Sequence, residues 1–228
     1  MKGIRLLILT AFLLVSCQTL PAINSTMPQA QPKSSVCPSP FLKEPYRFVH
    51  AIETRIGGET QGAIIGITLV DPSTRFVSCA IMTAEGMVLF EAEAKPTLKV
   101  IRALPPFDSG NFAKNMMEDI TLIFLAPEGE IKTKGILSDG AEICRWQEKS
   151  GAWIDVIARL PEGMDINKYS AYGNWQRRIK LNLTSENVYS SIELSAKETF
   201  NYSLLLTLIE AEPLEGELKT EKNKGTPE

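Results

Sequence analysis

The chain has 228 residues, of which 44% are hydrophobic and 22% are charged, and its formal net charge is −3. This composition is ordinary for a globular protein, and the absence of a basic block argues against nucleic acid as a partner. Beyond the first 16 residues no apolar stretch approaches about 20 residues, so no transmembrane helix is predicted.

The first residues have the pattern of an export signal. Lys2 and Arg5 precede an apolar run, Leu6 to Val15, which is too short to span a bilayer. Leu14-Val15-Ser16-Cys17 then resembles the lipobox of bacterial lipoproteins. That resemblance implies that residues 1–16 are a signal peptide and that Cys17 becomes an acylated (palmitate-bearing) N-terminus. An ordinary signal peptide that happens to contain a cysteine is the alternative.

The residues that follow predict a tether and a single domain. Residues 17–45 contain six prolines among polar side chains, a composition that favours an extended, unpacked chain. Residues 46–211 are the predicted domain, and residues 212–228 form a charged tail. Gln18 stands where an inner-membrane retention signal would place Asp, so we expect anchoring at the outer membrane, facing the periplasm.

The first part of the domain is predicted to be an antiparallel meander. Short runs of strand length are separated by Gly57-Gly58, by Asp71-Pro72 and by Glu85-Gly86, which are residues typical of turns. The predicted strands are 46–55, 62–70, 75–83 and 87–94.

The middle segment is predicted to be helical. Residues 97–104 lie between prolines and could form a short helix, and Asp108 or Ser109 could cap a longer one that ends near Leu125. Apolar side chains of the longer helix recur at intervals of three and four residues, which predicts one apolar face. These side chains are Phe112, Met116, Met117, Ile120, Ile123 and Phe124.

Strand patterns return after the helices. Alternation is clearest near the C-terminus, where Ile179 and Leu181 share one face while Lys180 takes the other. The predicted strands are 135–146, 152–160, 176–184, 188–196 and 202–211. The fold predicted from this order is mainly β with a helical lid (α+β), a curved antiparallel half-barrel wrapped around one or two helices.

The cysteines leave two alternatives open. With Cys17 assigned to lipid, Cys37, Cys79 and Cys144 remain, and an exported compartment permits a Cys79–Cys144 bridge. Their spacing matches no zinc or redox motif. We favour Cys79 and Cys144 as small buried side chains over the disulfide.

The order of elements resembles the lipoprotein-localisation fold of bacterial lipoprotein carriers and their outer-membrane receptor, and an uncharacterised lipoprotein family of that fold. Cys79-Ala-Ile-Met-Thr-Ala-Glu-Gly-Met-Val-Leu-Phe90 is similar to its glycine hairpin. Glu118-Asp-Ile-Thr-Leu-Ile-Phe-Leu-Ala-Pro127 is similar to its Asp-Leu-Gln-Leu stretch. The resemblance implies an unclosed half-barrel whose apolar concave face is covered by helices and receives acyl chains.

Strand alternation and the helix pattern together predict which side chains line that concave face. A filled core is the alternative to a ligand cavity, and methionines near the helix favour a surface that adapts to its ligand. The predicted lining residues are Phe48, Ile52, Ile65, Ile67, Val77, Cys79, Ile81, Val88, Phe90, Met116, Ile120, Phe124, Ile179, Leu181, Ile192 and Leu194.

No arrangement in the sequence favours catalysis, a cofactor or a metal site. His50 is the only histidine, no nucleophile motif accompanies it, and a buried core position is the better interpretation. The acidic pairs Glu118-Asp119 and Glu91/Glu93 are expected on solvated faces, and Gly57-Gly58 lacks a phosphate-binding pattern.

The sequence therefore predicts a non-enzymatic, membrane-anchored lipoprotein. We expect it to bind a lipid or an acylated partner in an apolar cavity, with a role in lipid or lipoprotein transport or envelope biogenesis. An envelope scaffold that has a filled core and acts through protein contacts is the second hypothesis. A hydrolase has no residue pattern to support it.

Overall fold

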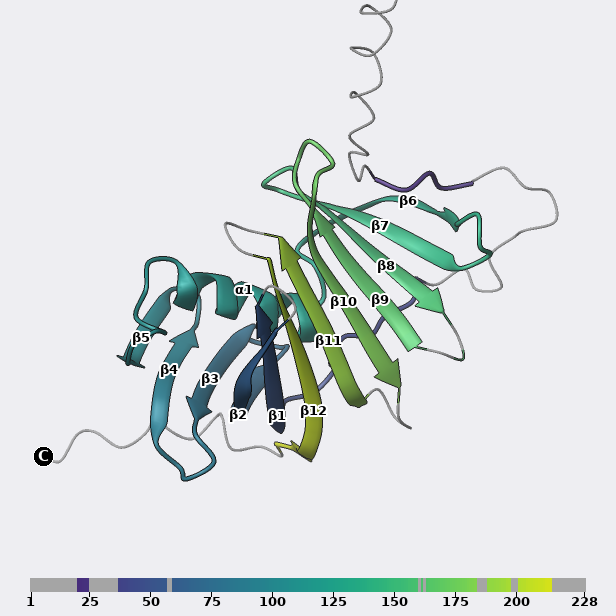
Figure 1. Cartoon of the computed structure of the whole chain (residues 1–228). Coiled ribbons are helices and arrows are strands. Elements are labelled where there is room, and N and C mark those ends of the chain that lie inside the picture. The colour runs from purple at the N-terminus through teal and green to yellow at the C-terminus, as the bar shows by residue number, and fades with distance from the viewer. Residues whose placement is uncertain are drawn as a thin grey trace, which may run out of the picture.

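The computed structural model describes residues 20–24, 37–56, 59–159, 161, 163–183, 188–197 and 201–214, so the predictions for Cys17 and Gly57-Gly58 lie outside it. The described residues form one twelve-stranded antiparallel sheet and one helix, α1 (Phe112–Phe124). Figure 1 shows a strongly curved sheet whose edge strands do not meet. We call the face that α1 packs against the concave face and the opposite one the outer face. The predicted fold class is confirmed.

The strands follow each other around the sheet almost in chain order. The order is β5-β4-β3-β2-β1-β12-β11-β10-β9-β8-β7-β6, so the first and last strands of the domain pair at its centre. Their bounds are β1 Tyr46–Ile56, β2 Glu59–Asp71, β3 Phe76–Met82, β4 Val88–Ala94, β5 Leu98–Ala103, β6 Gly129–Ile136, β7 Glu142–Glu148, β8 Trp153–Arg159, β9 Gly163–Tyr169, β10 Trp175–Leu183, β11 Tyr189–Lys197 and β12 Asn201–Pro213.

The middle segment differs from its prediction. Residues 97–104 were predicted as a short helix, but Leu98–Ala103 is strand β5, which pairs with β4 at the sheet edge. The longer predicted helix exists as α1, although it begins at Phe112 rather than after Asp108 or Ser109. It ends at Phe124, where Leu125 has extended backbone and Pro127 follows shortly after.

Two further strands differ from the sequence prediction. The run 135–146 is split by a turn, in which Gly140 has φ +85° and the Ala141 amide donates to Asp139 Oδ1 at 3.1 Å. It therefore contributes to two antiparallel strands, β6 and β7. The segment Gly163–Tyr169 was not predicted as a strand, yet it forms β9 between β8 and β10.

Residues 37–45 were predicted as tether but are attached to the domain. Cys37 forms a disulfide with Cys144 of β7, with an S–S distance of 2.01 Å. Phe41 is 4% exposed, and the Leu42 amide donates to the Phe124 carbonyl at the end of α1. The predicted alternative of a Cys79–Cys144 bridge is wrong, and so is the favoured free Cys144.

Residues 20–24 form a second attached segment, which lies on the outer face. Asn24 makes a backbone bridge to Ile136 of β6, and Arg145 Nη2 donates to the Pro21 carbonyl at 3.0 Å. Gly135 allows the segment 20–24 to lie this close to β6, because a Cβ on Gly135 would lie 2.5 Å from Ile23 Cγ2. Arg145 also forms a two-point ion pair with fully buried Asp155, through oxygens 2.6 and 2.7 Å away.

Candidate functional site

Most of the predicted lining residues meet in one buried cluster beneath α1. They come from both halves of the sheet and from the inner side of the helix, and each is at most 9% exposed. The members of this cluster that were predicted from the sequence are Phe48, Val77, Cys79, Ile81, Phe90, Ile120, Phe124, Ile179, Leu181, Ile192 and Leu194. Met116 is half-buried and packs against them.

Four predicted lining residues lie outside the cluster. Ile65 and Ile67 are opposite Ala51 and Val49, so they face the outer side, whereas Gly66 and Thr68 lie opposite His50 and Phe48. Their placement on the concave face was therefore wrong. The other two residues are half-buried: Ile52 and Val88.

The concave face under α1 is filled by side chains. Phe124 stacks on Phe48 with ring centroids 4.8 Å apart, and Phe112 meets the edge of Phe90 at 5.5 Å. Cys79 Sγ lies 3.7 Å from Met116 Sδ, and burial raises the pKa of the Cys79 thiol to about 12. In this state, an acyl chain would enter beneath the helix only if α1 moved.

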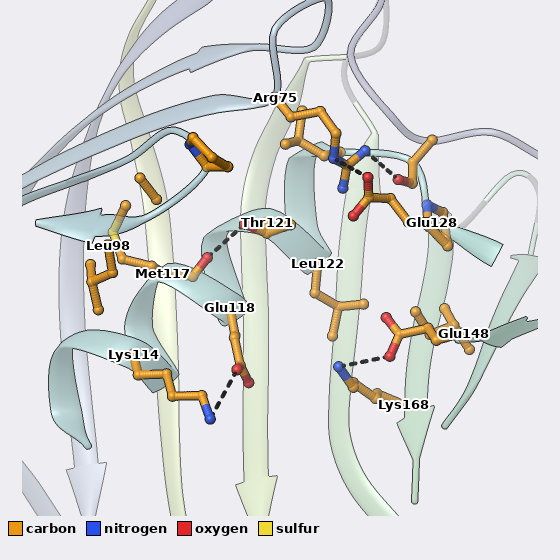
Figure 2. A pocket seen from close by; sticks show the side chains of 16 residues that line it. Arg75, Leu98, Lys114, Met117, Glu118, Thr121, Leu122, Glu128, Glu148 and Lys168 are labelled. Carbon is orange, nitrogen blue, oxygen red and sulfur yellow. Dashed lines mark hydrogen bonds and ion pairs between the residues drawn. The ribbon is translucent and has the colours of Figure 1, made fainter. Parts of the chain in front are cut away.

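A groove of about 430 Å³ opens beside α1. Its apolar wall includes Met117 and Leu122 of the helix, Leu125 just after it and Ile154 of β8. Figure 2 shows α1 crossing the groove with charged side chains around it. They form three ion pairs, Arg75–Glu128 at 3.3 Å, Lys114–Glu118 at 3.8 Å and Lys168–Glu148 at 3.3 Å. An apolar floor with a charged rim suits an amphiphile.

A buried polar network fastens α1 to the sheet. Asp119 Oδ1 accepts from Arg177 Nε of β10 at 2.7 Å, and Asp119 Oδ2 accepts from the Tyr202 hydroxyl of β12 at 2.8 Å. Asp119 and Arg177 are each 7% exposed. The prediction that Glu118 and Asp119 both lie on a solvated face holds for Glu118, whose side chain is 51% exposed, and is wrong for Asp119.

His50 is a buried member of the concave face. It is 2% exposed and lies near the rings of Phe48 and Phe124, at centroid distances of 5.8 and 6.4 Å. Burial disfavours the charged imidazolium and lowers the pKa of His50 from 6.5 to about 4. His50 is thus a neutral core side chain at pH 7.

This burial predicts an acid sensitivity. Because the pKa of His50 is lower in the folded chain, the unfolded chain binds a proton that the folded chain does not bind between pH 6.5 and 4. The free energy of unfolding therefore decreases as the pH falls from 6.5 towards 4. We expect the free energy of unfolding to drop by about 2 kcal/mol through this group between pH 7 and pH 4.5. Denaturant unfolding of wild type and His50→Gln at both pH values measures it. An equal drop in both proteins would contradict the prediction.

In the described part of the chain, no three His, Cys, Asp or Glu side chains lie close enough together to hold a metal ion. The same residues contain no helix long and apolar enough to cross a membrane. A second concavity, of about 330 Å³, lies on the outer face and is lined by Asn167, Trp175 and Arg178 among others.

Comparison with solved structures identifies the type of fold. No family model and no curated protein matches the sequence. Among solved structures, a LolA superfamily protein from Nitrosomonas europaea superposes with a TM-score of 0.51 at 12% identity, over 76% of this chain and 88% of that one. This chain has a LolA-type fold. An outer membrane lipoprotein-sorting protein domain from Vibrio parahaemolyticus matches with a TM-score of 0.40 at 9% identity, over 76% and 86% of the two chains. The first of these structures confirms the predicted lipoprotein-localisation fold.

Proposed function

We propose that this protein is a membrane-anchored lipoprotein of the bacterial envelope that binds an acyl chain, carried by a lipid or a lipidated partner. The anchor is the acylated Cys17, and the signal pattern before it together with Gln18 favours the outer membrane. Binding rather than catalysis is the proposed activity. The LolA-type fold supports this, because its unclosed sheet leaves the groove beside α1 open to a ligand.

The groove beside α1 carries the proposal. Its volume of about 430 Å³ lies within the range of ligand pockets, which is about 300–1,000 Å³. Met117, Leu122 and Ile154 give it an apolar wall continuous with the core, so a chain bound there could extend beneath the helix if α1 lifted. Each methylene removed from water contributes about 0.8 kcal/mol. The paired charges at the rim would remain in contact with a polar headgroup.

Filling the groove tests this proposal. Thr121 is half-buried on α1 and lines the groove, so we expect Thr121→Trp to weaken binding of a fluorescent fatty acid at least tenfold, a loss of about 1.4 kcal/mol. The titration uses the chain from residue 17 with Cys17→Ser. This variant carries no acyl anchor, so it can be handled without detergent. The matched control is Thr133→Trp, since Thr133 is half-buried on β6 away from the groove. Equal affinity in both variants would contradict binding in the groove.

A scaffold function is the second candidate, and the filled concave face favours it. Phe90, Ile166 and Ile179 are 0% exposed, so the core beneath α1 holds no vacant volume at these positions. On this hypothesis the protein acts through its surface and takes up no acyl chain. The same titration separates the two, because a scaffold would leave the wild-type chain without measurable uptake of the probe.

A further inference from the structure

Residues 20–24 determine how far the domain can lie from a lipid on Cys17. Leu20 packs on the turn between β9 and β10, where a Cβ on Gly173 would be 3.6 Å from Leu20 Cδ1 and Cγ. Only Gln18 and Thr19 separate Leu20 from Cys17. Fully extended, this connection spans about 11 Å from Cα to Cα. The attached domain therefore cannot stand off the membrane on a long tether.

The part of the domain nearest to Leu20 is rich in aromatic side chains. Trp153 of β8 and Trp175 of β10 both lie opposite Tyr169 of β9, so the three share the outer face at one end of these strands. Tyr172 projects from the β9–β10 turn and is 91% exposed. We call Trp153, Tyr172 and Trp175 the aromatic edge; Tyr169 lies beneath them and is 5% exposed.

The β7–β8 turn lies against the same edge. Gly151 in this turn has φ +85°, and a Cβ on it would lie 3.2 Å from the Ala171 Cβ. Lys149 in the turn is exposed, and the Arg178 guanidinium lies 5.4 Å from the centre of the Trp175 ring. Figure 1 shows both turns at the upper end of the strands β7 to β10.

We propose that the aromatic edge rests on the bilayer surface to which Cys17 is anchored. Tyrosine and tryptophan concentrate at membrane interfaces, since their rings are apolar and their polar atoms can meet headgroups. In the aromatic edge the exposed Tyr172 hydroxyl is available for this contact, whereas Trp175 Nε1 is buried and Trp175 would contribute only its ring. Basic side chains beside them suit anionic headgroups. This inference rests on the proposed acylation of Cys17, and it adds an orientation that acylation alone does not give.

The orientation also brings the groove to the membrane. Glu148, Ile154 and Lys168 line the groove, and they stand at the same ends of β7, β8 and β9 as the aromatic edge. The alternation of the strands places Ile154 and Lys168 on the face opposite Trp153 and Tyr169. An acyl chain that leaves the bilayer would thus have a short path around this edge to the groove.

A tryptophan reporter tests the orientation. The full acylated chain is inserted into phosphatidylethanolamine–phosphatidylglycerol vesicles whose lipids carry brominated acyl chains, which quench nearby tryptophan. We expect Tyr172→Trp to add fluorescence that is blue-shifted and quenched by the brominated lipid. The matched control is Met87→Trp, because Met87 is 56% exposed and directly precedes β4, after the β3–β4 turn. That turn lies at the lower left in Figure 1, far from the β9–β10 turn. The added fluorescence of Met87→Trp should be unquenched.

The outcomes separate the two proposals. Quenching of Met87→Trp alone, or of neither variant in chains that float with the vesicles, would overturn the orientation and leave acylation intact. A chain that does not float with vesicles would overturn acylation of Cys17 and the orientation that depends on it. Acyl-probe binding by the Cys17→Ser chain is measured independently of both.

Discussion

Asp119→Ala lowers the free energy of unfolding by about 3–5 kcal/mol, which is the largest single effect that we expect. The substitution leaves the Arg177 guanidinium, 7% exposed, without the carboxylate 2.7 Å away, and it removes the acceptor of the Tyr202 hydroxyl. Removing one partner of a buried ion pair costs more stability than the intact pair contributes. Urea unfolding followed by circular dichroism measures the change.

The neighbouring residue provides the control for this variant. Glu118 lies on the same helix but pairs with Lys114 at 3.8 Å in solvent, so Glu118→Ala should change stability by less than about 0.5 kcal/mol. A loss below about 1 kcal/mol for Asp119→Ala would contradict the prediction. A milder variant, Asp119→Asn, should also raise uptake of the acyl probe if α1 acts as a lid.

Loss of the Cys37–Cys144 disulfide lowers stability by about 2–5 kcal/mol. The bridge joins residues 107 positions apart, and closing so long a loop removes much entropy from the unfolded chain. It also holds residues 37–45 in place, where the Tyr189 hydroxyl donates to the Pro40 carbonyl at 3.0 Å. The double variant Cys37→Ser/Cys144→Ser, unfolded without reductant, gives the loss directly.

A chain that keeps Cys37 and Cys144 provides two checks on that measurement. With Cys17→Ser, the folded chain should expose no reactive thiol, because Cys79 is buried and its raised pKa keeps it protonated. Unfolding without reductant should expose one thiol. Three thiols would mean that the bridge does not form. Reductant should then leave the stability of the double serine variant unchanged while it lowers that of wild type.

The elements that could be predicted from the sequence are those with one apolar and one solvated face. β10 and β11 were predicted because Ile179 and Ile192 alternate with charged residues. α1 was predicted because its apolar side chains recur every three or four residues. The Asp139-Gly140 turn between β6 and β7 was also visible, and giving it more weight would have separated the two strands.

Other parts depend on partners distant in sequence. Five of the six residues in β5 are exposed, so no apolar face marks it as a strand, and pairing with β4 determines its structure. β9 has a polar sequence, but Asp165 pairs with Arg159 at 2.6 Å and Asn167 is buried beside Arg178. The residues of the site were also predicted only in part. Its apolar members followed from alternation, whereas the role of Asp119 depends on Arg177, 58 positions later.

The attachment of Asn24 to Ile136 affects how copies of this protein could associate through strand edges. An unclosed sheet has two such edges, here β5 and β6, and free edges allow strands of other molecules to add. On β6 the position at Ile136 is already occupied by the chain's own backbone. Copies that joined through β5 would pair it with the β5 of a second copy, a two-fold contact that closes on itself. Association through β5 alone would stop at a dimer, whereas association through both edges would permit a filament.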